Sequence, residues 1–344
     1  MPAISVLMPA YNAATYIAQA IDSILQQTFR DFELIIVNDG STDRTEDIVL
    51  SYQDNRIRYF KNDGNKGLIY TRNKLVELSS ANFIAFLDSD DLSMNTRLER
   101  QYAKFAADER LSFVSTSFYM INEYGEIVNR DNFYDLNSEE LKSTFLFLNP
   151  VATSSIMIRK AHLPEEVFRV DYPVCEDYDL WTRMMITHKG IVLPDFLVSY
   201  RVYNDSICKQ QPKNIIDRRN KIELNQLEYY FPNMYSAEDA AIHLSLVEFS
   251  LKNSLQDIPA LEQWIYKILD LNSCYHHFEE RILSQVLYER ILKKFLRLQQ
   301  YNISVFRTLL RFRKRLQPVL SAELRKKEAA ILAFSLTRKR WINL

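Results

Sequence analysis

The sequence predicts an α/β fold, in which a mainly parallel sheet flanked by helices is followed by an all-helical C-terminal region. Three observations support this. Short apolar runs alternate with amphipathic helical patterns up to about residue 116, as is typical of strand–helix–strand crossovers. Three carboxylates stand directly after the apolar run Phe83–Leu87. Beyond Pro212, the apolar residues recur with helical spacing.

The first part is predicted to alternate strands with helices. Strands are expected at 4–8, 34–37, 57–60, 83–87 and 111–115, where short runs are wholly or mostly apolar. Helices are expected between them: one with Ile17, Ile21, Ile24 and Leu25 on a single face, one capped by Ser41 and Thr42, one through 71–78, and one around 97–104. After residue 117 we expect an antiparallel hairpin at 119–128, a strand at 154–158 and a helix at 179–188. Pro212 marks the predicted boundary between residues 1–211 and the helical region 212–344.

Composition excludes several classes of protein. The apolar fraction of 47% is ordinary for a globular protein. Three widely spaced cysteines, with no C-x-x-C pair, indicate a reducing compartment and argue against a zinc site. The N-terminus lacks the features of a signal peptide, and no run of 18 apolar residues is present. We therefore expect a cytoplasmic protein.

The acidic segment Asp88-Ser89-Asp90-Asp91 is the most informative part of the sequence. Ligands of open α/β sheets bind beyond the carboxyl ends of the strands, and crowded carboxylates repel one another unless a cation neutralises them. Mg²⁺ or Mn²⁺, held by one or two carboxylates, commonly keeps a phosphate oxygen as a further ligand. The segment therefore predicts a metal–diphosphate site. Alternatively, Asp91 or Ser93 caps the next helix, but this would leave Asp88 and Asp90 unexplained.

Two other predicted strands end at Pro9-Ala10-Tyr11-Asn12 and at Asn38-Asp39-Gly40. A doubly wound sheet would bring these ends to the same edge as Asp88. Tyr11 is then placed to stack on a nucleobase and Asp39 to accept its N–H; the alternative is that Tyr11 packs and Asp39 closes a turn. Neither G-x-G-x-x-G nor G-x-x-x-x-G-K-[ST] is present, which argues against a nicotinamide enzyme and a P-loop NTPase.

Five motifs in order resemble glycosyltransferase family 2. They are ISVLMPAYN from Ile4, VNDGSTD from Val37, NKG from Asn65 with TRN from Thr71, DSDD from Asp88, and EDYDLW from Glu176. The resemblance covers about residues 4–201. It implies a GT-A fold (a Rossmann-like sheet) in a catalytic domain at 1–211, with a nucleotide-sugar half at about 1–116 and an acceptor half at about 117–211. It further implies an inverting, metal-dependent transfer from a nucleotide sugar to a glycan or lipid-linked acceptor in surface polysaccharide synthesis. A UDP-linked donor is expected, since uridine is the family's commonest base.

The resemblance also implies roles for individual residues. Pro9, Ala10, Tyr11, Asn12, Asp39, Arg72, Asp88 and Ser89 would bind the nucleotide. Asp88 and Asp90 would hold Mn²⁺ or Mg²⁺ as a DXD motif, Asp177 would be the catalytic base, and Glu176 and Trp181 would lie on the acceptor side. For Glu176 and Asp177 the alternative is an acidic first helical turn, and for Trp181 it is simple packing. Many relatives have Tyr-Arg-x-His near the end of the catalytic domain; here Tyr203 takes the histidine's place, so no histidine ligand is assigned.

The C-terminal segment from Tyr301 is strongly basic, with eleven Lys or Arg and only Glu323 and Glu328 as acids. A basic amphipathic helix favours an anionic membrane surface, which would place the enzyme peripherally on the inner face of the cell membrane. The alternative is that the basic segment docks on the rest of the chain, which is acidic, or on a second subunit. The segment contains no motif of aromatic and basic residues that is typical of nucleic-acid binding, so nucleic acid is not expected as a partner. A rival function is a non-catalytic nucleotide-sugar-binding or scaffold subunit of a membrane-associated assembly.

Overall fold

The computed structural model describes residues 1–131, 135–203, 212–246, 257–298 and 301–337. It divides into two compact units, which we describe separately. The first comprises Met1–Leu141 and Pro150–Arg218, and the second comprises Lys142–Asn149 and Arg219–Leu344. The helical unit therefore includes a short segment, 142–149, that the predicted boundary at Pro212 assigned to the first part.

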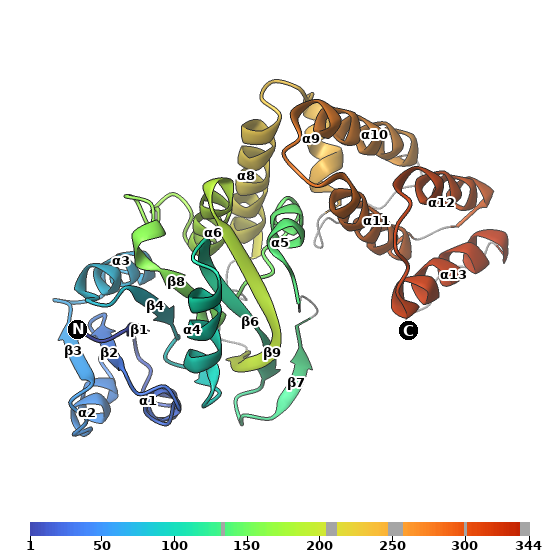
Figure 1. Cartoon of the computed structure of the whole chain (residues 1–344). Coiled ribbons are helices and arrows are strands. Elements are labelled where there is room, and N and C mark those ends of the chain that lie inside the picture. The colour runs from blue at the N-terminus through green and yellow to red at the C-terminus, as the bar shows by residue number, and fades with distance from the viewer. Residues whose placement is uncertain (132–134, 204–211, 247–256, 299–300, 338–344) are drawn as a thin grey trace. The chain divides into compact units, whose positions relative to one another are not determined.

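The first unit is built on a nine-stranded mixed sheet in the order β3-β2-β1-β4-β8-β6-β9-β5, with β7 paired to β6 (Figure 1). Its strands are β1 Ile4–Ala10, β2 Phe32–Asn38, β3 Ile57–Lys61, β4 Phe83–Phe86, β5 Leu92–Ser93, β6 Leu111–Ile121, β7 Ile127–Arg130, β8 Met157–Arg159 and β9 Lys189–Arg201. Strands β1 to β4 are parallel to one another, and β8 runs antiparallel to both β4 and β6. The expected α/β fold is confirmed, as is the hairpin, formed by β6 and β7.

Helices connect and cover these strands. They are α1 Ile17–Leu25, α2 Thr45–Leu50, α3 Leu68–Leu78, α4 Arg97–Ala107, α5 Ser138–Phe145 (of which the part up to Leu141 belongs here) and α6 Glu176–Thr187, with 3-10 turns at Thr153–Ser155 and Lys160–His162. Alternate residues of β1, namely Ile4, Val6 and Met8, pack in one core with Ile21 of α1 and Leu98 of α4. Side chains on one face of a strand recur every second residue, and those on one face of a helix recur every three to four residues. Apolar residues follow these two spacings here, which explains the predicted patterns.

Two local predictions are wrong. Residues Ser154 and Ser155 lie in a 3-10 turn, and the strand starts only at Met157, because Ser155 bonds back to the carbonyl oxygen of Ala152 through both its N–H and its hydroxyl. Ser41 and Thr42 do not cap α2, which begins at Thr45 after Arg44. The side chain of Asp43 instead accepts the N–H of Thr45.

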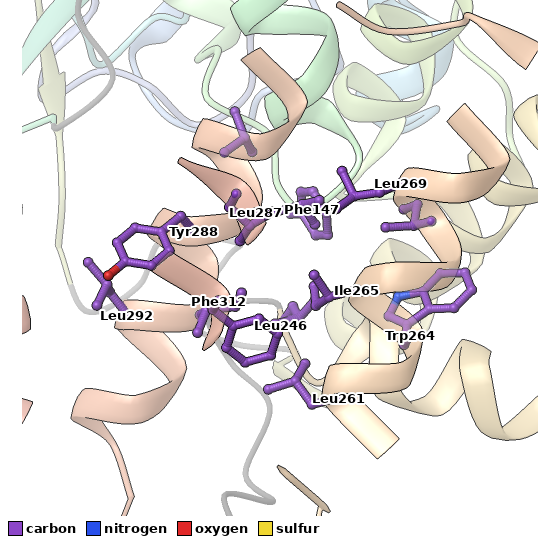
Figure 2. Packing of buried hydrophobic residues seen from close by; sticks show 14 of the residues in the cluster. Phe147, Leu246, Leu261, Trp264, Ile265, Leu269, Leu287, Tyr288, Leu292 and Phe312 are labelled. Atoms are coloured by element: carbon purple, nitrogen blue, oxygen red, sulfur yellow. The ribbon is translucent and has the colours of Figure 1, made fainter. Parts of the chain in front are cut away.

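The second unit consists of helices packed around a continuous apolar core (Figure 2). They are α8 Pro212–Tyr230, of which the part from Arg219 belongs here, α9 Ala237–Leu244, α10 Ile258–Tyr275, α11 Glu280–Leu296, α12 Ile303–Leu316 and α13 Ala322–Thr337. Trp264, Ile265, Leu287 and Phe312 lie in this core, together with Phe147 from the short segment 142–149. The all-helical C-terminal region is thereby confirmed. In the described part of the chain, every helix is too short or too polar to cross a bilayer.

Candidate active site

The predicted site residues that follow strands gather at one edge of the sheet. Strand β1 lies between β2 and β4, parallel to both, so Tyr11 and Asn12, Asp39 and Asp88 all follow strand ends that point the same way. Pro9 and Ala10 are the last, buried residues of β1 itself. The N–H of Asp39 donates to the carbonyl oxygen of Ala10 at 2.8 Å. The loops after β1 and β2 are therefore joined directly.

Asn12 adds contacts between the loops after β1 and β2, while its neighbour Tyr11 remains exposed. Asn12 has a left-handed backbone (φ 47°); its N–H donates to the hydroxyl of Ser41 at 2.9 Å, and its side-chain oxygen accepts the N–H of Thr42 at 2.9 Å. Asparagine tolerates this conformation better than most residues. Residue Tyr11 is 48% exposed, which does not agree with core packing and leaves the ring available for stacking.

Asp39 is buried, and its carboxylate holds a loop from the far side of the site. One oxygen accepts the side-chain N–H of Asn62 at 2.7 Å and the backbone N–H of Lys66 at 2.9 Å, and the other accepts the N–H of Gly67 at 2.8 Å. The turn alternative is wrong for this residue, because the turn at Gly40 is closed by Asn38, whose side-chain oxygen accepts the N–H of Ser41 at 2.8 Å. Each carboxylate oxygen can accept more than one bond, so the oxygen facing Gly67 retains capacity for another donor.

Arg72 on α3 lies at the centre of the site, and its side chain is almost fully buried. One guanidinium nitrogen donates to both oxygens of Asp88, at 3.0 and 3.1 Å, and another donates to the carboxylate of Glu176. Burial alone would lower its pKa, but the charges of Asp88, Glu176 and Asp177 outweigh burial and raise it. Carboxylates from the end of β4 and the start of α6, far apart in the sequence, thus meet at one cation.

Neither residue expected on the acceptor side has an open side chain. Glu176 is buried and ion-paired with Arg72. Trp181 is fully buried, with its ring 6.1 Å from that of Phe113. Their side chains face inward because α6 packs this face against the sheet and α3. The packing alternative for Trp181 agrees with the structure, and a direct contact of either side chain with an acceptor does not.

Asp177, the predicted base, lies in the first turn of α6 between buried neighbours. The hydroxyl of Thr153 donates to one carboxylate oxygen at 3.1 Å, and the N–H of Tyr178 donates to the other at 2.6 Å. Burial, followed by the charge of Glu176, raises the pKa of Asp177 to about 6 despite the opposing charge of Arg72. A carboxylate with such a pKa is a stronger base than an ordinary aspartate and is still ionised at neutral pH.

The acidic segment after β4 divides into exposed and buried carboxylates. Asp88, Ser89 and Asp90 are partly exposed, whereas Asp91 is buried and accepts the N–H of Arg201 at 2.7 Å. Helix α4 begins at Arg97, after Thr96, so neither Asp91 nor Ser93 is its capping residue. Burial and the neighbouring charge of Asp88 raise the pKa of Asp90, which shows that the two carboxylates repel one another.

The carboxylates of Asp88 and Asp90 suit a hard divalent cation as two of its oxygen ligands. Among the described residues, no cluster of three or more His, Cys, Asp or Glu side chains forms a complete metal site. Two partly exposed, mutually repelling carboxylates are nonetheless the kind of protein ligand that Mg²⁺ and Mn²⁺ use when a phosphate supplies further oxygens. Asp88 and Asp90 therefore fit a cation that arrives with its nucleotide.

Sequence reasoning missed two supports of these carboxylates. Ser154 accepts the backbone N–H of Asp88 at 3.0 Å, while its neighbour Thr153 binds Asp177, so one 3-10 turn contacts both sides of the site. At the end of β9, the hydroxyl of Tyr203 donates to Asp90 at 3.0 Å. The only sequence signal for the first support was an apparent strand at 154–158; for the second it was tyrosine in the place of a histidine.

Comparisons with known proteins agree on a family. The family described as Glycosyl transferase family 2 matches residues 5–166. An uncharacterized glycosyltransferase of Methanocaldococcus jannaschii is 31% identical over 208 residues, 59% of this chain and 72% of that protein. The Escherichia coli UDP-Glc:alpha-D-GlcNAc-diphosphoundecaprenol beta-1,3-glucosyltransferase WfaP is 30% identical over 226 residues, 65% of this chain and 86% of that protein.

The fold has a relative of known structure. The crystal structure of residues 1–349 of TarS from S. aureus in complex with UDP superposes with a TM-score of 0.55 at 17% sequence identity. The match covers 98% of this chain and 93% of that one. At this identity the likeness concerns the fold, and it extends over both the sheet-containing and the helical units.

Proposed function

The chain belongs to glycosyltransferase family 2, and we propose that it is an inverting enzyme that uses a UDP-linked sugar. The proposed acceptor is a hydroxyl group of a glycan or lipid-linked sugar in surface polysaccharide synthesis. The name of the E. coli relative supports this reading, because it specifies a UDP-linked donor and a sugar on diphosphoundecaprenol. The reaction is assigned to residues 1–211.

The meeting of Asp88, Glu176 and Asp177 around Arg72 is the observation that carries the proposal. Inversion requires an acceptor hydroxyl to attack the sugar from the face opposite the leaving diphosphate, while a base removes the proton of that hydroxyl. Asp88 belongs to the diphosphate side and Asp177 is the candidate base. Arg72 joins the two sides with a buried ion pair, so their separation is fixed by the fold.

The nucleotide is assigned to the loops after β1, β2 and β4. Tyr11 presents an exposed ring for stacking on the base, and Asp39 retains acceptor capacity for an N–H of the base. Pro9, Ala10, Asn12 and Ser89 line the strand ends beside them. Arg72 already lies between two carboxylates, so its role is to orient Asp88 rather than to neutralise the diphosphate by itself.

Mn²⁺ or Mg²⁺ would be held by Asp88 and Asp90. As a Lewis acid, a bound divalent cation stabilises the charge that develops on a leaving nucleoside diphosphate. Tyr203 holds one oxygen of Asp90 through its hydroxyl, and Ser154 holds the backbone at Asp88. These two contacts orient the carboxylates before the nucleotide binds. A role for the chain at the inner face of the membrane follows from the proposed lipid-linked acceptor.

Incubation with a panel of nucleotide sugars, with Mn²⁺, with Mg²⁺ and with EDTA, tests this function. We expect slow hydrolysis of one UDP-sugar that depends on the cation, and NMR of the first-formed sugar should show the inverted anomer. Binding of the nucleotide sugar without any turnover, on water or on lipid-linked acceptors, would favour the rival reading of a non-catalytic subunit. Retention of the anomeric configuration would exclude Asp177 as a general base for direct displacement.

A further inference from the structure

Helix α12 of the helical unit has an inner face that belongs to the core. Val305, Leu309, Phe312 and Leu316 are buried in the apolar cluster, and Thr308 is buried beside them. The helix carries five basic residues and no acidic one. Because its most apolar side is already covered by protein, α12 is not free to insert deeply into a bilayer as an isolated amphipathic helix would.

The flanks of α12 are neutralised by neighbouring helices. Arg311 pairs with Glu262 of α10 at 2.5 Å. Arg313 pairs with Glu328 of α13 at 3.0 Å, and Arg315 pairs with Asp270 of α10 at 3.2 Å. Three of the five cations therefore have acid partners within this unit, and they account for part of the basic composition without any external ligand.

The side of α12 opposite the core is different. Ile303, Arg307, Leu310 and Lys314 follow one another at intervals of four, three and four residues, so they form a single stripe. Ile303 and Leu310 are 49% and 41% exposed. Arg307 and Lys314 are exposed, and in the described part of the chain neither has an acid partner. At 1.5 Å per residue the stripe is roughly 16 Å long.

We propose that this outward stripe of α12 is a docking surface for a bilayer that contains anionic phospholipid. Cations reach lipid phosphates while adjacent aliphatic side chains enter the headgroup layer. The stripe lies on a single helix and alternates aliphatic residues with cations, which is typical of a helix at a headgroup layer, whereas recognition of a peptide commonly uses a groove. The inference rests on the proposed function, because a lipid-linked acceptor requires the enzyme to work at a membrane. With two aliphatic residues and two cations that lack an acid partner among the described residues, the contact is shallow, reversible and sensitive to salt.

Flotation of the full-length protein with phosphatidylcholine vesicles, with and without phosphatidylglycerol, tests the surface. We expect the wild type to float only with the anionic vesicles at low salt. The variant Arg307→Glu/Lys314→Glu should reduce the partition coefficient by at least about 10-fold, and Ile303→Ser/Leu310→Ser should reduce it by several fold. Lys104→Glu/Lys189→Glu makes the same charge change at exposed positions of the first unit and should float like the wild type.

The outcomes separate this surface from the proposed function. Equal loss in the control variant, or undiminished flotation of Arg307→Glu/Lys314→Glu, would overturn the assignment. So would self-association of the wild type that those two substitutions abolish without any binding to vesicles. Melting temperature and donor hydrolysis should be unchanged in Arg307→Glu/Lys314→Glu. Turnover without flotation defeats the lipid surface alone, and flotation without nucleotide binding or turnover defeats the proposed function alone.

Discussion

Arg72 donates two hydrogen bonds to Asp88, at 3.0 and 3.1 Å, from a position almost completely shielded from solvent. Its other terminal nitrogen binds Glu176 on a different element. A planar guanidinium can bind carboxylates in two directions at once, whereas an ammonium group acts as a single point charge. The identity of this residue as arginine is therefore as important as its charge.

Replacing Arg72 should damage the fold as well as the site. Arg72→Met leaves Glu176 buried without its partner, and loss of one member of a buried pair costs about 3–5 kcal/mol. Arg72→Lys keeps the charge but cannot span both carboxylates, so we expect an intermediate loss. Urea unfolding measures both. Equal stability of Arg72→Met and the wild type would show that the ion pair contributes little.

Asp177→Asn should reduce turnover by about 10²- to 10⁴-fold while leaving nucleotide affinity nearly unchanged. An amide cannot accept the proton of the acceptor hydroxyl, but it retains the size of the carboxylate. The measurements are kcat with the donor identified in the panel and calorimetry with UDP. Thr153→Val is the companion variant: it removes the hydroxyl that orients Asp177, and we expect a smaller loss of turnover. Full activity of Asp177→Asn would remove Asp177 from the mechanism.

The pH dependence of kcat/KM should show an acid limb near pH 6, because the base must be ionised and the pKa of Asp177 is raised to about 6. Below that pH the rate should fall as the carboxylate becomes protonated. Glu176→Gln removes the neighbouring negative charge that helps to raise this pKa, so the limb should move to lower pH. A limb that stays in place would indicate that another group titrates there.

The raised pKa of Asp177 also allows a loss of catalysis to be distinguished from a loss of folding. A carboxyl group whose pKa is higher in the folded protein than the usual 3.8 favours folding when protonated, and this contribution is lost as the pH rises through about 6. An uncharged asparagine side chain at this position avoids that loss. Asp177→Asn should therefore melt no lower than the wild type at pH 7.5, which separates a loss of catalysis from a loss of structure.

Gly40→Ala should weaken nucleotide binding. Gly40 has a φ of +73°, and a Cβ atom there would lie 2.5 Å from the backbone of Gly64. The loop that contains Gly64 continues to Lys66 and Gly67, which donate to Asp39, so the clash would displace the loop from the site. Gly125→Ala is the matched control: its φ is +87°, but the space around it is open. We expect it to cost about 1–2 kcal/mol of stability without altering the affinity for UDP.

The sequence predicted the parts of the fold that depend on local pattern. Short runs of mostly apolar residues located β1, β2 and β4, and turn residues after them located three loops of the site. The pairing of β6 with β9 and the insertion of antiparallel β8 depend on contacts between distant segments, so periodicity could not reveal them. Burial of Glu176 and Trp181 was equally hidden, because their side-chain directions are set by how α6 packs. The hydroxyl contacts of Thr153 were missed because they belong to an irregular turn.

The segment 142–149 has a consequence for how this protein is made. Leu146 and Phe147 are buried among residues such as Leu227, Ile265 and Leu287, all of which leave the ribosome later. During synthesis these two side chains remain uncovered until most of the polypeptide has emerged, which makes the nascent protein a candidate for chaperone capture at this point. A clone that stops before α8 would keep them exposed permanently, so shortened versions of the enzyme should carry polar replacements at both positions.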